Sequence, residues 1–208
     1  MIYKIIFAIN YKNMNNDFEN LRKEILVCQK CQLSKQRTNV VFGEGKFDAK
    51  IMCIGEGPGR DEDIQGRPFV GRSGQLLDKI LGVCGFSRAE NVFIGNIVKC
   101  RPPENRAPLP QERETCIPYL LKQIEIIEPK IIVLLGATAL NGLIDPNLKI
   151  TKVRGNWIEW NGRLAMPTFH PAALLRNPNV KKDSWEDFKK IVQKYRELVD
   201  ANHKSDYC

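Results

Sequence analysis

Short apolar segments alternate with amphipathic helical segments from residue 50 onward, and this alternation limits the fold more than any other feature of the chain. Apolar strands are predicted at residues 51–54, 92–94 and 131–135,. Helices are predicted at about 73–85, from Pro110 onward, near 138–143 and at about 183–199,. Residues 152–159 and 163–168 flank Asn161-Gly162 and predict a β-hairpin,. Such alternation indicates an α/β fold in which helices cover both faces of a mostly parallel sheet.

The length of 208 residues suits a single compact domain,. The segment Met14-Asn-Asn-Asp-Phe-Glu carries a helix N-cap signal, and Phe18, Leu21 and Ile25 follow at helical spacing,. We therefore expect residues 1–13 to be an N-terminal extension outside the core. Residues 14–200 are expected to form one domain, and residues 201–208 a polar tail.

The charge of the chain favours a polyanionic partner, because 32 lysines and arginines against 24 acidic residues give a net charge of +8,. The apolar run at residues 5–9 is far shorter than the roughly 20 residues that a membrane helix needs. It also lacks the small-residue cleavage site of a secretory signal,. We therefore expect a cytoplasmic protein without a membrane partner. We also expect a monomer.

Four of the seven cysteines are spaced as metal ligands, and cysteines in a cytoplasmic chain favour metal binding over disulfides,. Cys28 and Cys31 form a C-x-x-C motif after the first helix, while Cys100 and Cys116 bracket a proline-rich loop. These four soft ligands suit either zinc or an iron–sulfur cluster, and spacing alone leaves both open. Two others, within an apolar strand and near a helix end, are expected to be buried core thiols: Cys53 and Cys84,.

Four distinctive positions come directly after predicted strands: Gly55, Asn96, Gly136 and His170. The carboxyl ends of parallel strands meet at one edge of a sheet and ligands bind there, so we expect the active site at this edge. The segment Gly55-Glu-Gly-Pro-Gly-Arg-Asp-Glu-Asp lets a ligand approach the backbone closely,. It lacks the Gly-Lys-Ser/Thr ending of a phosphate loop and is rich in carboxylates, so it suits a neutral heterocycle or a water better than phosphate.

Three further features each allow a structural and a functional interpretation. Phe69, between polar, glycine-rich flanks, is either a core plug or a stacking platform for a flat base,. His170, before Pro171, is either structural or catalytic,. The leucines of the following loop are either buried or form a wedge that enters a base stack while an arginine contacts phosphate: Leu174, Leu175 and Arg176,.

Taken together, these segments resemble the family 4 uracil-DNA glycosylases, an iron–sulfur branch of the uracil-DNA glycosylase superfamily. The resemblance covers about residues 17–199 and rests on the C-x-x-C motif and four longer segments in the same order. These segments are Gly55-Glu-Gly-Pro-Gly, Gly66-Arg-Pro-Phe-Val-Gly, Asn96-Ile-Val-Lys-Cys-Arg-Pro-Pro and His170-Pro-Ala-Ala-Leu-Leu-Arg-Asn-Pro.

The resemblance implies a three-layer α/β/α sandwich with a four-stranded, mostly parallel sheet. It also implies one structural [4Fe–4S] cluster per chain, held by Cys28, Cys31, Cys100 and Cys116. In this interpretation the cluster ties the N-terminal helix to a loop whose basic residues lie near DNA: Lys99, Arg101 and Arg106.

The implied activity is hydrolysis of the N-glycosidic bond of uracil in single- or double-stranded DNA, which leaves an abasic site for base excision repair. The expected catalytic residues are His170, Asn96 and Glu62. The expected contacts to uracil are Glu56, Gly57, Phe69, Asn96 and His170. The expected contacts to DNA are Arg101, Arg106, Ser73, Leu174, Leu175 and Arg176.

One part of the family comparison leaves a gap. In the best-known family of these enzymes, the loop after the first strand carries an aspartate for the attacking water and a tyrosine that excludes thymine. The corresponding positions here are Gly57 and Gly59. Glu62 is our candidate for the group that blocks the 5-methyl of thymine, and the water is expected to be held by backbone and Asn96.

Two other functions remain as alternatives. The first is a relative that binds or crosslinks uracil-DNA without turnover; that branch carries an extra basic, histidine-containing loop, whereas Gly71-Arg-Ser-Gly leads straight into a helix here. The second is a redox or nucleotide-binding protein in which the cluster carries electrons. Release of uracil from DNA separates a glycosylase from both.

Overall fold

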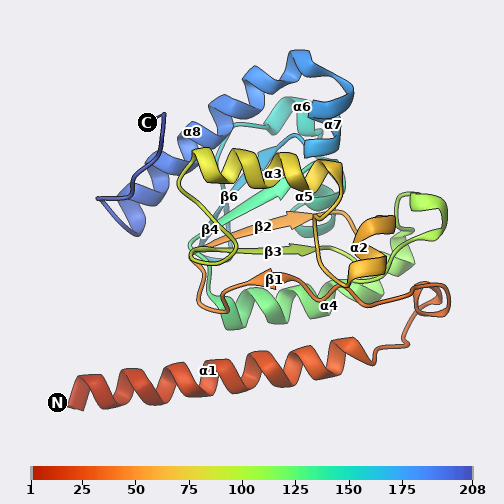
Figure 1. Cartoon of the computed structure of the whole chain (residues 1–208), viewed down its shortest axis with the longest axis horizontal. Coiled ribbons are helices and arrows are strands. Elements are labelled where there is room, and N and C mark those ends of the chain that lie inside the picture. Colours follow the sequence, from red (N-terminus) through yellow and green to blue (C-terminus); the bar gives the residue numbers. More distant parts are fainter. Residues whose placement is uncertain (1, 208) are drawn as a thin grey trace.

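The computed structural model describes residues 2–207, with side chains from residue 13 onward, and its centre is a six-stranded sheet in the order β1-β3-β2-β4-β6-β5. The four inner strands are parallel: β3 (Val92–Asn96), β2 (Ile51–Gly55), β4 (Ile131–Leu135) and β6 (Arg163–Thr168). The edge strands β1 (Glu44–Gly45) and β5 (Ile158–Trp160) are antiparallel to their neighbours. The sheet is therefore mixed and mostly parallel (Figure 1).

The expected number of four strands is wrong because it covers only the parallel centre. β1 has two residues, too few to show the alternation by which a strand is recognised,. β5 belongs to the predicted hairpin, whose turn residues Asn161 and Gly162 have φ angles of 47° and 72°, as a two-residue hairpin turn requires,. The hairpin is also shorter than predicted, since residues 150–153 form helix α6 (Ile150–Val153).

Helices cover both faces of the sheet, so the three-layer expectation is confirmed (Figure 1). On one face, α1 (Ile2–Leu26), α4 (Pro110–Ile127) and α5 (Ala137–Leu143) pack on side chains such as Met52. On the other, α3 (Arg72–Val83) and α8 (Lys181–Leu198) pack on side chains such as Cys53. The remaining helices are short: α2 (Arg60–Gln65), α7 (Pro171–Arg176), and 3-10 turns at Gln32–Lys35, Pro103–Asn105 and Pro178–Val180.

The first helix begins earlier than predicted. α1 runs without a break from Ile2 through the Met14 segment, because an asparagine inside a helix costs only about 0.7 kcal/mol or less and does not force a start,. Phe18, Leu21 and Ile25 are buried, as their spacing predicts. The placement of residues 1–13 outside the core stays a prediction, since side chains before residue 13 lie outside the described residues.

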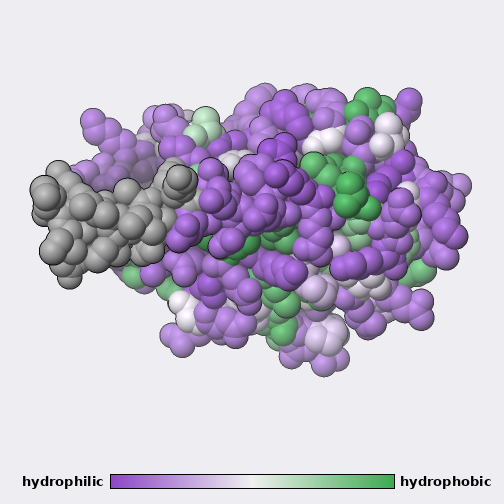
Figure 2. Space-filling model, turned by 90° about the horizontal axis from the view of Figure 1, so that it is seen from below, coloured by the Kyte–Doolittle hydropathy of each residue, from purple (hydrophilic) through white to green (hydrophobic). Residues whose placement is uncertain are grey.

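The surface on the side of α1 is mainly hydrophilic, with a compact hydrophobic patch away from the grey residues (Figure 2). Two of the exposed apolar side chains of the molecule, Leu26 and Val27, follow each other at the end of α1. No helix among the described residues is long and apolar enough to span a membrane.

Two further predictions concern the core thiols Cys53 and Cys84 and the C-terminal tail at residues 201–208. Cys53 and Cys84 are buried, and burial raises the pKa of the Cys53 thiol to about 12, so both are core thiols as expected. Part of the C-terminal tail packs against the domain. His203 is buried, stacks on Phe86 with 4.5 Å between ring centroids, and its Nε2 lies 2.8 Å from the Cys84 carbonyl oxygen.

Candidate active site

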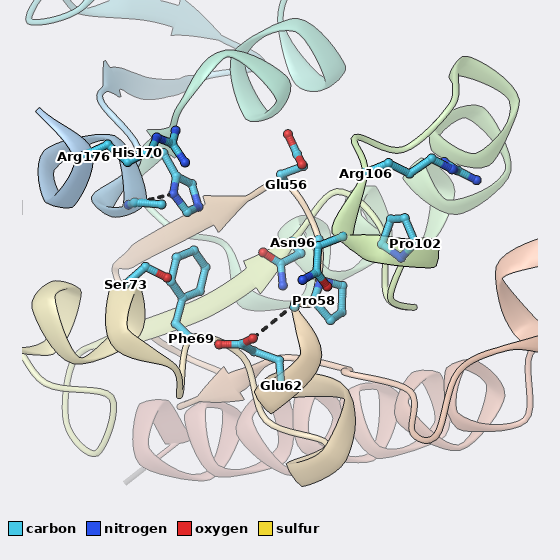
Figure 3. A pocket seen from close by; sticks show the side chains of 14 residues that line it. Glu56, Pro58, Glu62, Phe69, Ser73, Asn96, Pro102, Arg106, His170 and Arg176 are labelled. Atoms are coloured by element: carbon cyan, nitrogen blue, oxygen red, sulfur yellow. Dashed lines mark hydrogen bonds between the residues drawn. The ribbon is translucent and has the colours of Figure 1, made fainter.

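A cavity of about 420 Å³ opens at the carboxyl ends of β2, β3 and β6, the edge predicted for the active site. Figure 3 shows Phe69 and His170 on one side of it and Pro102 and Arg106 on the other, with Asn96 between them. The full lining is Glu56, Gly57, Pro58, Gly59, Glu62, Phe69, Ser73, Asn96, Pro102, Asn105, Arg106, His170, Ala172 and Arg176. All five residues expected to contact uracil thus meet in one pocket. Gly136 does not line it, but lies beneath His170, whose Cβ a side chain at Gly136 would approach to 3.0 Å.

Asn96, the last residue of β3, presents an unsatisfied amide to the pocket. The residue is 2% exposed, and its Oδ1 is buried with no hydrogen-bond partner among the described residues. Gly55 makes room for it: a Cβ there would lie 2.5 Å from both Asn96 Oδ1 and Phe69 Cζ. Because an unpaired buried acceptor is costly, the arrangement calls for a ligand that supplies a donor.

Phe69 is held in a strained backbone conformation. Its φ angle is 52°, in the left-handed region that bulky residues rarely adopt,. Arg88 donates hydrogen bonds to the carbonyls of Pro68 and Phe69, and a Cβ at Gly74 would lie 1.9 Å from the Phe69 carbonyl oxygen. These contacts fix the phenyl ring beside His170, with 5.5 Å between ring centroids and 30° between planes.

His170 follows β6 and is the N-cap residue of α7. Its Nδ1 accepts the backbone N–H of Ala172 at 3.1 Å, so the neutral ring carries its proton on Nε2,. Burial, with a smaller contribution from Arg176, lowers the pKa of His170 from 6.5 to about 4, against the opposing effect of Glu62. At neutral pH the imidazole is therefore an uncharged hydrogen-bond donor.

Glu62 joins the two loops that form one wall of the pocket. Its carboxylate accepts the backbone N–H groups of Gly59 at 3.1 Å and of Val70 and Gly71 at 2.9 Å each. A Cβ at Gly59 would lie 2.8 Å from Glu62 Oε2, so the carboxylate occupies the space that a side chain at position 59 would need.

Glu56 and Gly57 line the pocket directly after β2. Thr138, in α5, donates a hydrogen bond from its hydroxyl to the Glu56 carboxylate. A Cβ at Gly57 would lie 2.6 Å from Val98 Cγ2, so any larger residue there requires Val98 to move. Sequence reasoning missed Thr138, which carries no local signal of a role. It also missed Asn105, although the proline-rich segment pointed to its loop.

The arginines expected to contact DNA lie around or near the pocket. Arg106 and Arg176 line it, and Arg106 makes two hydrogen bonds of 2.7 and 2.8 Å with Glu112. Arg101 donates to Asn105 Oδ1 at 2.7 Å, which brings it close to the same rim. Ser73, at the start of α3, also lines the pocket.

Two side chains that were expected at or near DNA are buried in the structure. Leu174 is 2% exposed, because it lies on the side of α7 that faces α3 and α8, so only Leu175, which is 39% exposed, is free to act as a wedge. Lys99 is also 2% exposed. Its ammonium donates to the Asn96 carbonyl and to Gln123 inside the protein, so it does not reach DNA.

The four predicted metal ligands line a second, smaller pocket: Cys28, Cys31, Cys100 and Cys116. All four are free thiols. Arg37 donates to Cys100 Sγ at 3.1 Å, and the backbone N–H of Lys99 donates to Cys116 Sγ at 3.3 Å. Among the described residues no three potential ligands are drawn together as one metal ion would require.

Comparisons with known proteins show which family the chain belongs to. The model of the Uracil DNA glycosylase superfamily matches residues 42–194. A type-4 uracil-DNA glycosylase of Thermotoga maritima is 53% identical over 161 residues, covering 76% of this chain and 83% of the relative. Its counterparts from Saccharolobus solfataricus and Sulfurisphaera tokodaii are 48% and 46% identical, over 86% and 85% of this chain and 86% and 84% of their own lengths.

The fold and the first pocket define an α/β protein that can bind a ligand at the carboxyl edge of its sheet,. A separate pocket is lined by four cysteines. The sequence matches narrow that class. The chain belongs to the uracil DNA glycosylase superfamily and, within it, to the type-4 uracil-DNA glycosylases.

Proposed function

We propose that this chain is a monofunctional uracil-DNA glycosylase, which hydrolyses the N-glycosidic bond of uracil in single- or double-stranded DNA and leaves an abasic site. The observation that carries the proposal is the unpaired, buried Oδ1 of Asn96, which faces the pocket beside Phe69 and His170. The family membership of the chain points to the same activity.

Recognition of uracil rests on the Asn96 amide. A base inside a duplex must first leave the stack to reach such a pocket, at a cost of a few kcal/mol. Oδ1 of Asn96 then accepts the uracil N3–H, which satisfies the buried acceptor, while Nδ2 donates to O4,. Cytosine presents the opposite pattern on this edge, so it leaves both partners unpaired. Phe69 stacks on the base, and the backbone at Glu56 and Gly57 contacts it as well.

Bond cleavage rests on His170. As the glycosidic bond breaks, the base becomes an anion with charge on O2, and the sugar becomes cationic. The Nε2–H of a neutral His170 is the donor for this oxygen, and it is already oriented because Nδ1 is occupied by the Ala172 N–H,. The role is electrostatic stabilisation, without proton transfer from a histidine cation.

The remaining groups of the proposed site exclude thymine, hold the attacking water and bind the DNA strand. Glu62 excludes the 5-methyl group of thymine, and its three backbone hydrogen bonds support this role because they keep the carboxylate in one position. The attacking water is held by the backbone of the Glu56–Gly57 segment and by Asn96. The DNA strand is bound around the pocket by Ser73, Arg101, Arg106, Leu175 and Arg176.

The four-cysteine pocket is proposed to hold one structural [4Fe–4S] cluster. Four cysteine sulfurs are the donor set that such a cluster uses, and all four cysteines line the same pocket,. Burial raises the pKa of Cys116 to about 11, and iron displaces such protons on binding,. A cluster held there would cross-link the segment after α1 to the loop before α4. It would take no part in bond breaking.

The test uses a labelled DNA strand that contains a single uracil. Incubation with the purified protein followed by hot alkali cleaves the strand at abasic sites, and the same strand with thymine or cytosine stays intact. Asn96→Ala abolishes cleavage, while Asn161→Ala, a matched change at the distant hairpin turn, leaves it unchanged. A denaturant-resistant protein–DNA adduct in place of released uracil would establish the crosslinking alternative. The crosslinking branch carries an extra loop at this place, whereas here α3 begins at Arg72, immediately after Gly71, which argues against that outcome.

A further inference from the structure

The four-cysteine pocket is electropositive. Its lining contains three cationic side chains and, within the part of the chain that the structure describes, no aspartate or glutamate: Lys30, Arg37 and Lys99. Lys30 is partly neutralised from outside by Glu24, 3.7 Å away, and Arg37 donates directly to Cys100 Sγ. Four neutral thiols give no reason for such a concentration of positive charge. A group with net negative charge in this pocket would account for the three cations.

Lys99 is the most informative of the three cations because it is fully enclosed. A buried ammonium without an anionic partner is strongly unfavourable. Its hydrogen-bond acceptors are neutral: the Asn96 carbonyl at 2.9 Å and Gln123 Oε1 at 2.6 Å. Lys99 lines the same pocket as Cys100 and Cys116, so metal-ligating thiolates at those two positions would supply anions beside it.

Lys99 also contacts the backbone of a residue that lines the base pocket. The carbonyl that it holds belongs to Asn96, whose side chain faces the uracil site. Gln123 anchors the ammonium further, since its Nε2 donates to the Phe42 carbonyl at 2.9 Å. At the other end of the residue, the Lys99 backbone N–H donates to Cys116 Sγ. One residue thus contacts both the cysteine pocket and the strand end that recognises the base.

We propose that Lys99 is the buried counter-ion of the cysteine-ligated cluster, and that it fixes the end of β3 by holding the Asn96 carbonyl. The proposal rests on the proposed [4Fe–4S] cluster. The negative charge at the thiolates keeps the ammonium buried, and the buried ammonium keeps Asn96 in place. Lys99 is a positioning residue, which links the cluster to base recognition without touching the substrate.

The test compares three substitutions in the iron-loaded protein. Lys99→Met removes the charge and the hydrogen bonds, Lys99→Gln removes the charge but keeps a donor, and Lys99→Arg keeps the charge. Lys122→Met is the matched control. Lys122 is an exposed cation in α4, next to Gln123, and the substitution removes one positive charge. The readouts are the rate of iron release to a chelator, the midpoint potential of the cluster, and the affinity for free uracil.

We expect iron release to be about tenfold faster in both neutral variants, the size of effect that outer partners of metal ligands commonly have. Their midpoint potentials shift in the negative direction, because a lost positive charge disfavours the reduced cluster. Lys99→Arg and Lys122→Met stay near wild type. Uracil affinity falls more in Lys99→Met than in Lys99→Gln. If Lys99→Met does not fold, the Gln and Arg variants still separate charge from size.

The proposal would be overturned if the rate of iron release and the midpoint potential did not depend on the charge at position 99. It would also be overturned if the wild-type protein bound no iron–sulfur cluster. The proposed glycosylase function fails in a different way. In that case the wild-type protein carries its cluster, with potential and iron release as described, and does not release uracil from DNA.

Discussion

The phenyl ring of Phe69 stacks on the imidazole of His170, with 5.5 Å between the ring centroids and 30° between the ring planes. The two rings come from segments that are about a hundred residues apart, and both line the pocket. Phe69 offers a π-face to a flat base, whereas His170 offers a single N–H donor. In the proposed function, the pair therefore divides base binding and charge stabilisation between two adjacent side chains.

Replacement of Phe69 by leucine keeps apolar volume but removes the stacking face. We expect kcat/KM for uracil excision to fall about tenfold to a hundredfold, since stacking of a base on an aromatic side chain is worth about 1–3 kcal/mol. Single-turnover and steady-state excision assays measure the loss. Phe86→Leu is the matched control: this ring is buried against His203, far from the pocket, so it affects stability but not excision. Equal loss in both variants would count against stacking.

His170→Ala removes the donor to the uracil O2. We expect the single-turnover rate to fall about 10²- to 10³-fold, as when one oxyanion donor is removed from an active site. Binding of uracil-containing DNA, measured by fluorescence anisotropy, stays near wild type because the contact strengthens only as the bond breaks. A loss of DNA affinity as large as the loss of rate would refute the electrostatic role.

The lowered pKa of His170 has two consequences for pH dependence. The folded protein keeps this ring neutral down to a pKa of about 4, whereas the unfolded chain binds a proton there below about 6.5. Protonation therefore favours the unfolded state, and the contribution of His170 to the free energy of unfolding falls as pH drops from about 6.5 toward 4. Denaturant titrations of wild type and His170→Gln isolate this part. The excision rate should show no inflection near pH 6.5, and an inflection there would mean that the ring titrates as in water.

Much of this arrangement was predictable, for a topological reason. Gly55, Asn96 and His170 follow parallel strands, and parallel strands bring their carboxyl ends together whatever the details of packing,. The four cysteines were recognisable because the C-x-x-C motif marks a ligand pair. The edge strands were not, since β1 has only two residues.

Residues whose role depends on distant contacts could not be found in the same way. Arg88 holds the Phe69 carbonyl across 19 residues, and Thr138 reaches Glu56 across 82. Lys99 lies in a basic segment that suggested a DNA contact, yet its side chain points inward to Gln123. Local sequence does not state which way a side chain points at the end of a strand. Tertiary packing decides it.

Arg176→Ala tests the DNA-facing side of the pocket. Arg176 is exposed at the rim of the pocket. We expect weaker DNA binding and a salt dependence flatter by about one unit of slope in a log–log plot, the effect of one lost phosphate contact. Lys130→Ala is the control, because Lys130 is exposed at the opposite edge of the sheet, before β4. An unchanged slope in Arg176→Ala would remove this residue from the DNA interface.

Leu174 and Leu175 are adjacent in α7 but differ in exposure, 2% against 39%, and this contrast separates packing from DNA contact. Leu174→Ala should lower the free energy of unfolding by about 2–5 kcal/mol, because it opens a cavity between α7 and its neighbours,. Leu175→Ala should change it by no more than about 0.5 kcal/mol, as exposed substitutions usually do. On duplex DNA, however, Leu175→Ala should slow excision, since an apolar wedge helps to unstack the target base. On single-stranded DNA, where no partner strand has to be opened, the same variant should excise uracil at nearly the wild-type rate. A Leu175→Ala protein that is equally impaired on both substrates would show that the leucine does not act as a wedge.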